Sequence, residues 1–114
     1  MHRSSDACIR VTHETVMSHL AKNHAEIRLS AFQVIDDLFQ RSHLFRELLL
    51  SDFQRFTCLV TGTDPKQPLP LPKTVATKLK EKSLLAIRQW HDKFGEGYPR
   101  LKLSYNYLKS NKKV

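Results

Sequence analysis

The stretch HAEIRLSAFQVIDDLFQRSH, residues 24–43, decides the fold class. Polar residues recur along it with the spacing four, three, four, three, which places them on one line of an α-helix: Glu26, Ser30, Gln33, Asp37 and Gln40. Most other positions are apolar and are predicted to be buried: Ile27, Ala31, Phe32, Val34, Ile35, Leu38 and Phe39. A helix with one narrow polar line must be covered on several sides, as an inner helix of a stacked superhelix is. The pattern therefore predicts that residues 24–42 form the most buried helix of an all-α protein.

Length and composition are those of one globular helical domain. The chain has 114 residues, of which 40% are hydrophobic and 26% are charged, so it can build a modest core. Only three glycines occur, and alternating β-branched residues are rare, which indicates helices rather than strands.

Positive charge is concentrated in the second half of the chain. Residues 1–61 contain seven basic and seven acidic residues, whereas residues 62–114 contain twelve basic and four acidic residues and so carry the whole net charge of +8. Such asymmetry indicates nucleic acid, an acidic protein or an anionic membrane as a partner, or only a soluble lysine-rich face. Six cations are the predicted partner-binding residues: Lys78, Lys82, Arg88, Lys93, Arg100 and Lys102. Lysine outnumbers arginine and no aromatic ladder accompanies the lysines, so we hypothesise that they steer docking rather than read a nucleic-acid sequence.

Helix start and stop signals divide the chain into about six helical segments. The predicted ranges are 5–21, 24–42, 44–50, 51–61, 73–94 and a last helix that begins at Pro99. Asn23 with Glu26, and Ser51 with Gln54, have the spacing of capping boxes at the second and fourth segments.

The stretch GTDPKQPLPLP, residues 62–72, separates the fourth helix from the fifth. Four prolines lie in it, a density that no helix or strand interior tolerates. We predict an extended connector that begins at Gly62 and sets the angle between two helices. Its single PxxP motif is a weak signal for an SH3 ligand.

Residues 73–94 carry one apolar side at helical spacing: Ala76, Leu79, Ser83, Ala86, Trp90 and Phe94. Trp90 is either an exposed anchor for a partner or a core residue, and its register with Leu79 and Phe94 favours the core. The predicted structural core joins the two long helices: Ile27, Phe32, Ile35, Leu38, Phe39, Leu79, Trp90 and Phe94.

The sequence holds no recognisable catalytic, metal-binding or cofactor-binding constellation. HETVMSH, residues 13–19, resembles a zinc-protease helix only superficially, because the second ligand position is Met17. Cys8 and Cys58 lack the spacing of a metal site and are predicted to be buried free thiols in a reducing compartment. Because no catalytic constellation is recognisable, the sequence predicts a non-enzymatic protein. Because there is no signal peptide and no apolar run of membrane-spanning length, it predicts a soluble, intracellular protein without membrane contact.

Two long segments resemble VHS/ENTH-like domains. They are HAEIRLSAFQVIDDLFQRSHLFRELLLSDF and PKTVATKLKEKSLLAIRQWHDKF, the second of which contains a W-x-x-x-F pair, Trp90 and Phe94. The resemblance implies a right-handed superhelix, with residues 4–114 forming its third helix onward and about five to six helices in all. The first two helices of such a domain would then be missing. Their absence implies that apolar surface is bared near Ile9 and Val16, and that no ubiquitin-site residue can be carried over, because that site lies on the second helix.

Shorter motifs resemble the N-terminal domain of the UV-stimulated scaffold protein A family. They are HAEIRLSAFQ, GTDPKQPLPLP, KFGEGY and YNYLKSNKKV. This resemblance implies a non-enzymatic scaffold, without a cofactor, in transcription-coupled nucleotide excision repair, nuclear and on chromatin. The domain would dock on the Cockayne syndrome WD-repeat protein A, within its ubiquitin ligase, at lesion-stalled RNA polymerase II. Contacts with transcription factor TFIIH and a ubiquitin-specific protease would belong to regions outside this chain.

Two other functions stay open from the sequence. One is a VHS-type adaptor that binds ubiquitin or sorting peptides in membrane trafficking. The other is a basic helical module that binds nucleic acid directly through residues 73–113.

Overall fold

The computed structural model describes residues 3–110, and all regular structure in that range is helical. This confirms the all-α prediction, whereas the handedness of a superhelix stays a prediction. The elements are α1 (Arg3–Leu20), α2 (Ala25–Arg41), α3 (His43–Leu50), α4 (Phe53–Thr61), α5 (Lys73–Phe94), the short 3-10 helix η1 (Gly95–Gly97) and α6 (Pro99–Ser110).

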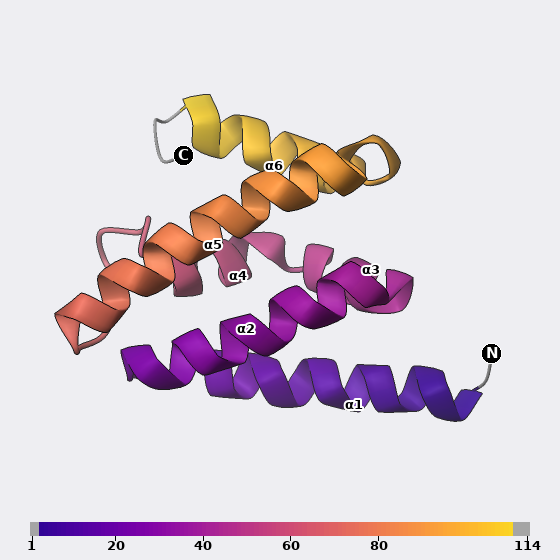
Figure 1. Cartoon of the computed structure of the whole chain (residues 1–114), viewed down its shortest axis with the longest axis horizontal. Helices are drawn as coiled ribbons and strands as arrows, with labels where there is room; N and C mark the ends of the chain where they lie inside the picture. The colour runs from indigo at the N-terminus through magenta and orange to yellow at the C-terminus, as the bar shows by residue number, and fades with distance from the viewer. Residues whose placement is uncertain (1–2, 111–114) are drawn as a thin grey trace.

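The four longer helices form one layer, and α4 lies behind it. Figure 1 shows α1, α2, α5 and α6 following one another across the molecule, and each of these neighbouring pairs is in contact. Helix α4 contacts every other α-helix, and α3 closes one end against α1 and α2. The layer gives the domain its flattened dimensions of 41 × 28 × 20 Å.

The core centres on the contact between α2 and α5. The ring of Phe39 stacks on Trp90 with 4.0 Å between centroids, and Phe56 of α4 also stacks on Trp90, with 5.7 Å between centroids. All three side chains are fully buried. Phe32, Ile35 and Leu79 are also buried, so the structure places most of the predicted core residues inside.

The prediction that residues 24–42 form the most buried helix is wrong. Six of the 17 residues of α2 are buried, against five of the nine residues of α4. The reason is position, since the short α4 packs behind the layer against every other α-helix, while one side of α2 faces solvent. Two of the buried residues of α4 are threonines, and Thr61 satisfies its hydroxyl by donating to the carbonyl of Thr57 at 2.6 Å.

Several single-residue predictions for the core are corrected by the structure. Ile27 and Val34 are 41% and 45% exposed, because they lie on the side of α2 that no other helix covers. Leu38 and Phe94 are half-buried and pack against the rim of the core.

On α1, the expected bare apolar surface does not run through Val16, which is buried, and Ile9 is half-buried. The neighbouring α2 and α3 cover this side of α1.

Neither cysteine is a buried thiol. Cys8 lies on the exposed side of α1, and Cys58 is half-exposed on α4, so the predicted burial is wrong although both thiols are free.

Arg28 is a buried cation that the sequence reading missed. Its Nε donates to the carbonyl of Lys22 and its Nη1 donates to the carbonyl of Leu59, both at 2.8 Å. The second carbonyl lies in the last turn of α4, where no helical N–H is available to it. Burial lowers the pKa of the Arg28 guanidinium, but the group stays charged and ties α4 to the turn between α1 and α2.

Helix caps differ from the predicted capping boxes. His24, not Asn23, caps α2, and its Nδ1 accepts a hydrogen bond from the backbone N–H of Glu26. Ser42 caps α3 by accepting from the N–H of Phe45. Ser51 ends α3 instead of starting α4, because its hydroxyl donates to the carbonyl of Leu48.

The connector between α4 and α5 is anchored at both ends. A turn at Asp64, whose carboxylate accepts from the N–H of Lys66, interrupts the extended course that was predicted. Leu71 then accepts a hydrogen bond from the N–H of Ala25 at 3.0 Å, which joins the starts of α5 and α2. Gly62 ends α4 in the left-handed conformation, with φ +63°.

Gly62→Ala should lower the free energy of unfolding by about 1–2 kcal/mol, because a side chain is unfavourable at positive φ. A Cβ at this position would also lie 2.8 Å from Cγ of Leu69. Gly97→Ala is the matched control, since no atom lies within 4 Å of its added Cβ. Urea unfolding of both variants would test this, and equal stability of the two would contradict it.

Ile35→Ala should cost about 2–5 kcal/mol of unfolding free energy, as large-to-small core substitutions do. Ile27→Ala removes the same atoms from the same helix but should cost less than about 1 kcal/mol, because the Ile27 side chain is 41% exposed and lies outside the core. Comparing the two variants by thermal and urea unfolding separates burial from helix propensity. A similar loss in both would show that this side of α2 is covered.

Candidate interaction surfaces

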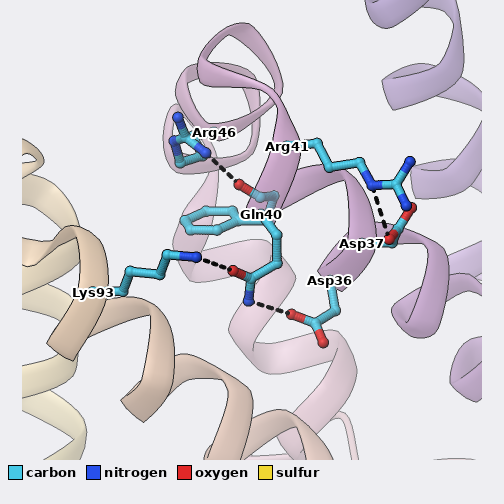
Figure 2. A network of polar contacts seen from close by, with 7 residues as sticks. Asp36, Asp37, Gln40, Arg41, Arg46 and Lys93 are labelled. Atoms are coloured by element: carbon cyan, nitrogen blue, oxygen red, sulfur yellow. Dashed lines mark hydrogen bonds and ion pairs between the residues drawn. The ribbon is translucent and has the colours of Figure 1, made fainter.

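A chain of polar contacts joins α2 to α5 beside the aromatic core. The indole N–H of Trp90 donates to Oδ1 of Asp36 at 2.7 Å, and the amide of Gln40 lies 3.5 Å from the same oxygen. Nζ of Lys93 donates to Oε1 of Gln40 at 3.3 Å, as Figure 2 shows. Trp90 is thus held by both its ring and its N–H, which makes it a structural residue.

Arg46 holds the end of α5 against α3. Its guanidinium lies 4.2 Å from the ring centroid of Phe94, and its Nη1 donates to the carbonyl of Phe39 at 2.6 Å. Its Nε donates to the hydroxyl of Tyr98 at 2.9 Å, and that hydroxyl also contacts Nδ1 of His43. These contacts explain why Phe94 can be half-buried and still be fixed in position.

The six cations predicted to bind a partner are all exposed, but they do not form one patch. Lys78, Lys82 and Lys93 are spaced along one side of α5, where Lys93 reaches Gln40 of α2, whereas Arg88 lies on a different side of the helix. The other two cations contact segments of the domain itself. Arg100 donates to the carbonyl of Leu50 at 3.1 Å, and Lys102 lies 3.9 Å from a carboxylate oxygen of Glu96.

A shallow groove lies between α1 and α2 and was not predicted as a binding surface. It has a volume of about 420 Å³ and includes the exposed Ile27 and Val34. Its lining is Val16, His19, His24, Glu26, Ile27, Ser30, Ala31 and Val34. The sequence did show apolar residues beside the polar line of α2, among them Ile27 and Val34. Helical periodicity alone could not distinguish a surface groove from the core, so it predicted that these residues are buried.

A larger groove of about 660 Å³ lies between α4 and α6. Its rim carries Leu103 and Tyr107, which are 70% and 68% exposed. These two residues are four apart, so they share a face of α6 opposite the buried Leu101 and Leu108. That second apolar spacing was the sequence signal for this groove.

Comparison with known proteins shows which family shares this sequence. The family model of the UVSSA N-terminal domain matches residues 1–112. The chain belongs to this family. It is 53% identical over 112 residues to UV-stimulated scaffold protein A of Xenopus tropicalis and 48% identical to that of Rattus norvegicus, with 98% of this chain covered in each case. The homolog of Arabidopsis thaliana is 36% identical over the same length.

The match spans only part of these longer relatives. The chain covers 15% of the Xenopus tropicalis protein and 16% of the Rattus norvegicus protein.

No group of three or more potential metal-binding side chains occurs among residues 3–110 of this UVSSA N-terminal domain. Within the same range, no helix is both long enough and apolar enough to cross a membrane. A third hollow is lined by His13, Glu14, Met17, Ser18, Leu49, Asp52 and Arg55.

His13 of α1 lies in an environment that shifts its ionisation. Its ring lies edge-on to Phe45 with 5.6 Å between centroids. Burial lowers the pKa of His13 below its ordinary value of 6.5, although the nearby carboxylates of Glu14 and Asp52 act in the opposite direction. The neutral form is therefore favoured in the folded domain.

The unfolding free energy should fall as the pH falls below about 6.5, because the unfolded chain then binds a proton at His13 that the folded domain binds only at lower pH. Above that pH the contribution is fully present. His13→Gln should flatten the profile between pH 7 and 5, whereas Val11→Gln, at an exposed position of the same helix without a titratable group, should not. Urea unfolding over this pH range measures both, and parallel profiles for the two variants would contradict the assignment.

Proposed function

We propose that this domain is a non-enzymatic protein-docking module of a scaffold that acts in the repair response to ultraviolet damage. The observation that carries the proposal is the family match over residues 1–112, together with relatives that are named UV-stimulated scaffold protein A. A scaffold needs rigid surfaces rather than catalytic groups, and the domain offers two grooves and exposed cations on a well-packed helical frame.

We further propose a specific partner and place. The domain would dock on the Cockayne syndrome WD-repeat protein A and its ubiquitin ligase at RNA polymerase II stalled by a lesion, in transcription-coupled nucleotide excision repair in the nucleus. TFIIH and a ubiquitin-specific protease would bind other parts of the full scaffold. The support is the resemblance of the connector and the last helix to the family. The VHS/ENTH-like architecture over residues 4–114 belongs to the same proposal.

A pull-down from nuclear extract tests the partner. The 114-residue chain is immobilised, and the extract is used with and without nuclease. We expect the WD-repeat protein to be retained equally in both arms, because the contact is between proteins. Retention of nucleic acid and loss of the WD-repeat protein after nuclease would favour direct nucleic-acid binding instead.

Trp90→Ala serves as the folding control, since loss of the buried ring should cost about 3–5 kcal/mol and remove all specific binding. Retained ubiquitin or sorting peptides without the WD-repeat protein would favour the trafficking adaptor. Retention of none of these proteins would contradict the docking proposal.

A further inference from the structure

One side of α5 carries lysines in a regular row. Lys78, Lys82, Gln89 and Lys93 are spaced four, seven and four residues apart, which places them along one side of the helix. All four are exposed. We call this row the lysine edge. It extends for about 22 Å along the helix axis at the usual rise per residue.

Contacts with α2 fix one end of the lysine edge. Lys93 donates to Gln40 of α2 at 3.3 Å, and its Nζ lies 5.3 Å from the ring centroid of Phe94. Gln40 is itself oriented by Asp36, whose carboxylate accepts a hydrogen bond from Trp90 in the core. The ammonium of Lys93 is therefore held in one place by neutral groups, which reduces the entropy lost when it binds a partner.

Among the described residues, no carboxylate forms an ion pair with a lysine of the lysine edge. Among residues 3–110, the ion pairs are Arg41 with Asp37, His43 with Glu47, His91 with Asp92 and Lys102 with Glu96. None of them includes a lysine of the edge. Two carboxylates border the edge, because Glu81 lies three residues after Lys78 and Asp92 directly precedes Lys93, but neither forms an ion pair with an edge lysine among the described residues.

An apolar residue accompanies the charges. Leu85 is 54% exposed, lies seven residues after Lys78 and sits beside the edge between its two ends. We propose that the lysine edge is the docking surface for an acidic segment of a protein partner, with carboxylates against Lys78, Lys82 and Lys93 and an apolar side chain against Leu85. This inference rests on the proposed function only in taking the domain to be a protein-docking module.

The composition of the edge favours a protein over nucleic acid. It has no arginine and no aromatic side chain, the two groups that grip phosphates and stack on bases. Lys82 and Lys93 are separated by about 16 Å along the axis, a gap filled by an amide and Leu85 rather than by further cations. An exposed leucine between point charges suits a segment of mixed acidic and apolar residues.

Binding of a defined peptide tests the surface. The probe is a fluorescent peptide in which glutamates flank one leucine, and binding to the 114-residue chain is followed by anisotropy at several salt concentrations. Lys78→Gln, Lys82→Gln and Lys93→Gln combined should weaken binding about fivefold or more, since three surface charge pairs are lost. Affinity of the original chain should fall as salt rises.

A matched triple variant separates this surface from net charge. Lys66→Gln, Lys80→Gln and Lys109→Gln remove the same charge from exposed lysines away from the edge, and we expect less than about a twofold change. Exchanging the peptide leucine for serine, or Leu85→Ser in the domain, should also weaken binding. Thermal unfolding of each variant confirms that the fold is kept.

Three results would overturn the inference: no binding of the peptide, equal weakening by the two triple variants, or tighter binding of single-stranded or duplex oligonucleotides that depends on the lysine edge. The measurement uses purified chain and peptide, so it does not depend on the pull-down. Peptide binding with failure to retain the WD-repeat protein would support the edge and contradict only the proposed partner.

Discussion

The contact of Trp90 with α2 is the interaction on which the rest of the domain depends. The indole ring stacks on Phe39, and its N–H donates a hydrogen bond to Asp36. Trp90 therefore fixes both the distance and the rotation of α5 relative to α2. A large aromatic ring that is also hydrogen-bonded tolerates few alternative packings. Because α2 contacts α1 and α5 contacts α6, this one interface sets the order of the whole layer.

Backbone carbonyls at element ends are the second constraint. Arg28 binds the carbonyls of Lys22 and Leu59, Arg46 binds that of Phe39, and Arg100 binds that of Leu50. These guanidinium groups satisfy carbonyl oxygens in the last turns of α2, α3 and α4, which have no partner within their own helix, and one in the turn after α1. Arginine is suited to this work because it offers several donors and stays charged when it is partly buried. Part of the basic composition therefore serves folding, and only the remainder is available to partners.

This division of the cations bears on function. The net charge of +8 suggested one basic surface, but the structure divides it into the lysine edge, cations that hold other segments and cations on separate sides. A row of point charges beside an exposed leucine, on a helix fixed by the core, is a different kind of surface from a nucleic-acid groove. Such a surface agrees with the proposed role of the domain in a scaffold protein, and the family model of the UVSSA N-terminal domain matches residues 1–112.

The sequence by itself determined the helices and most of their ends. Apolar periodicity and the positions of Gly62, the prolines of the connector and Pro99 are local signals, so they act before any tertiary contact forms. Only the tertiary structure decided which side of each helix is covered. Ile27 and Arg28 are adjacent, yet the isoleucine is exposed and the arginine is buried. The arginine is buried because two carbonyl groups from distant segments accept its hydrogen bonds, and the isoleucine is exposed because no neighbouring helix reaches it. The same division applies to the cations that were predicted to bind a partner. Spacing along α5 is enough to predict a row of lysines. Only the tertiary structure shows that Arg100 donates to the carbonyl of Leu50 and that Lys102 lies beside Glu96, so that these two cations contact the domain itself.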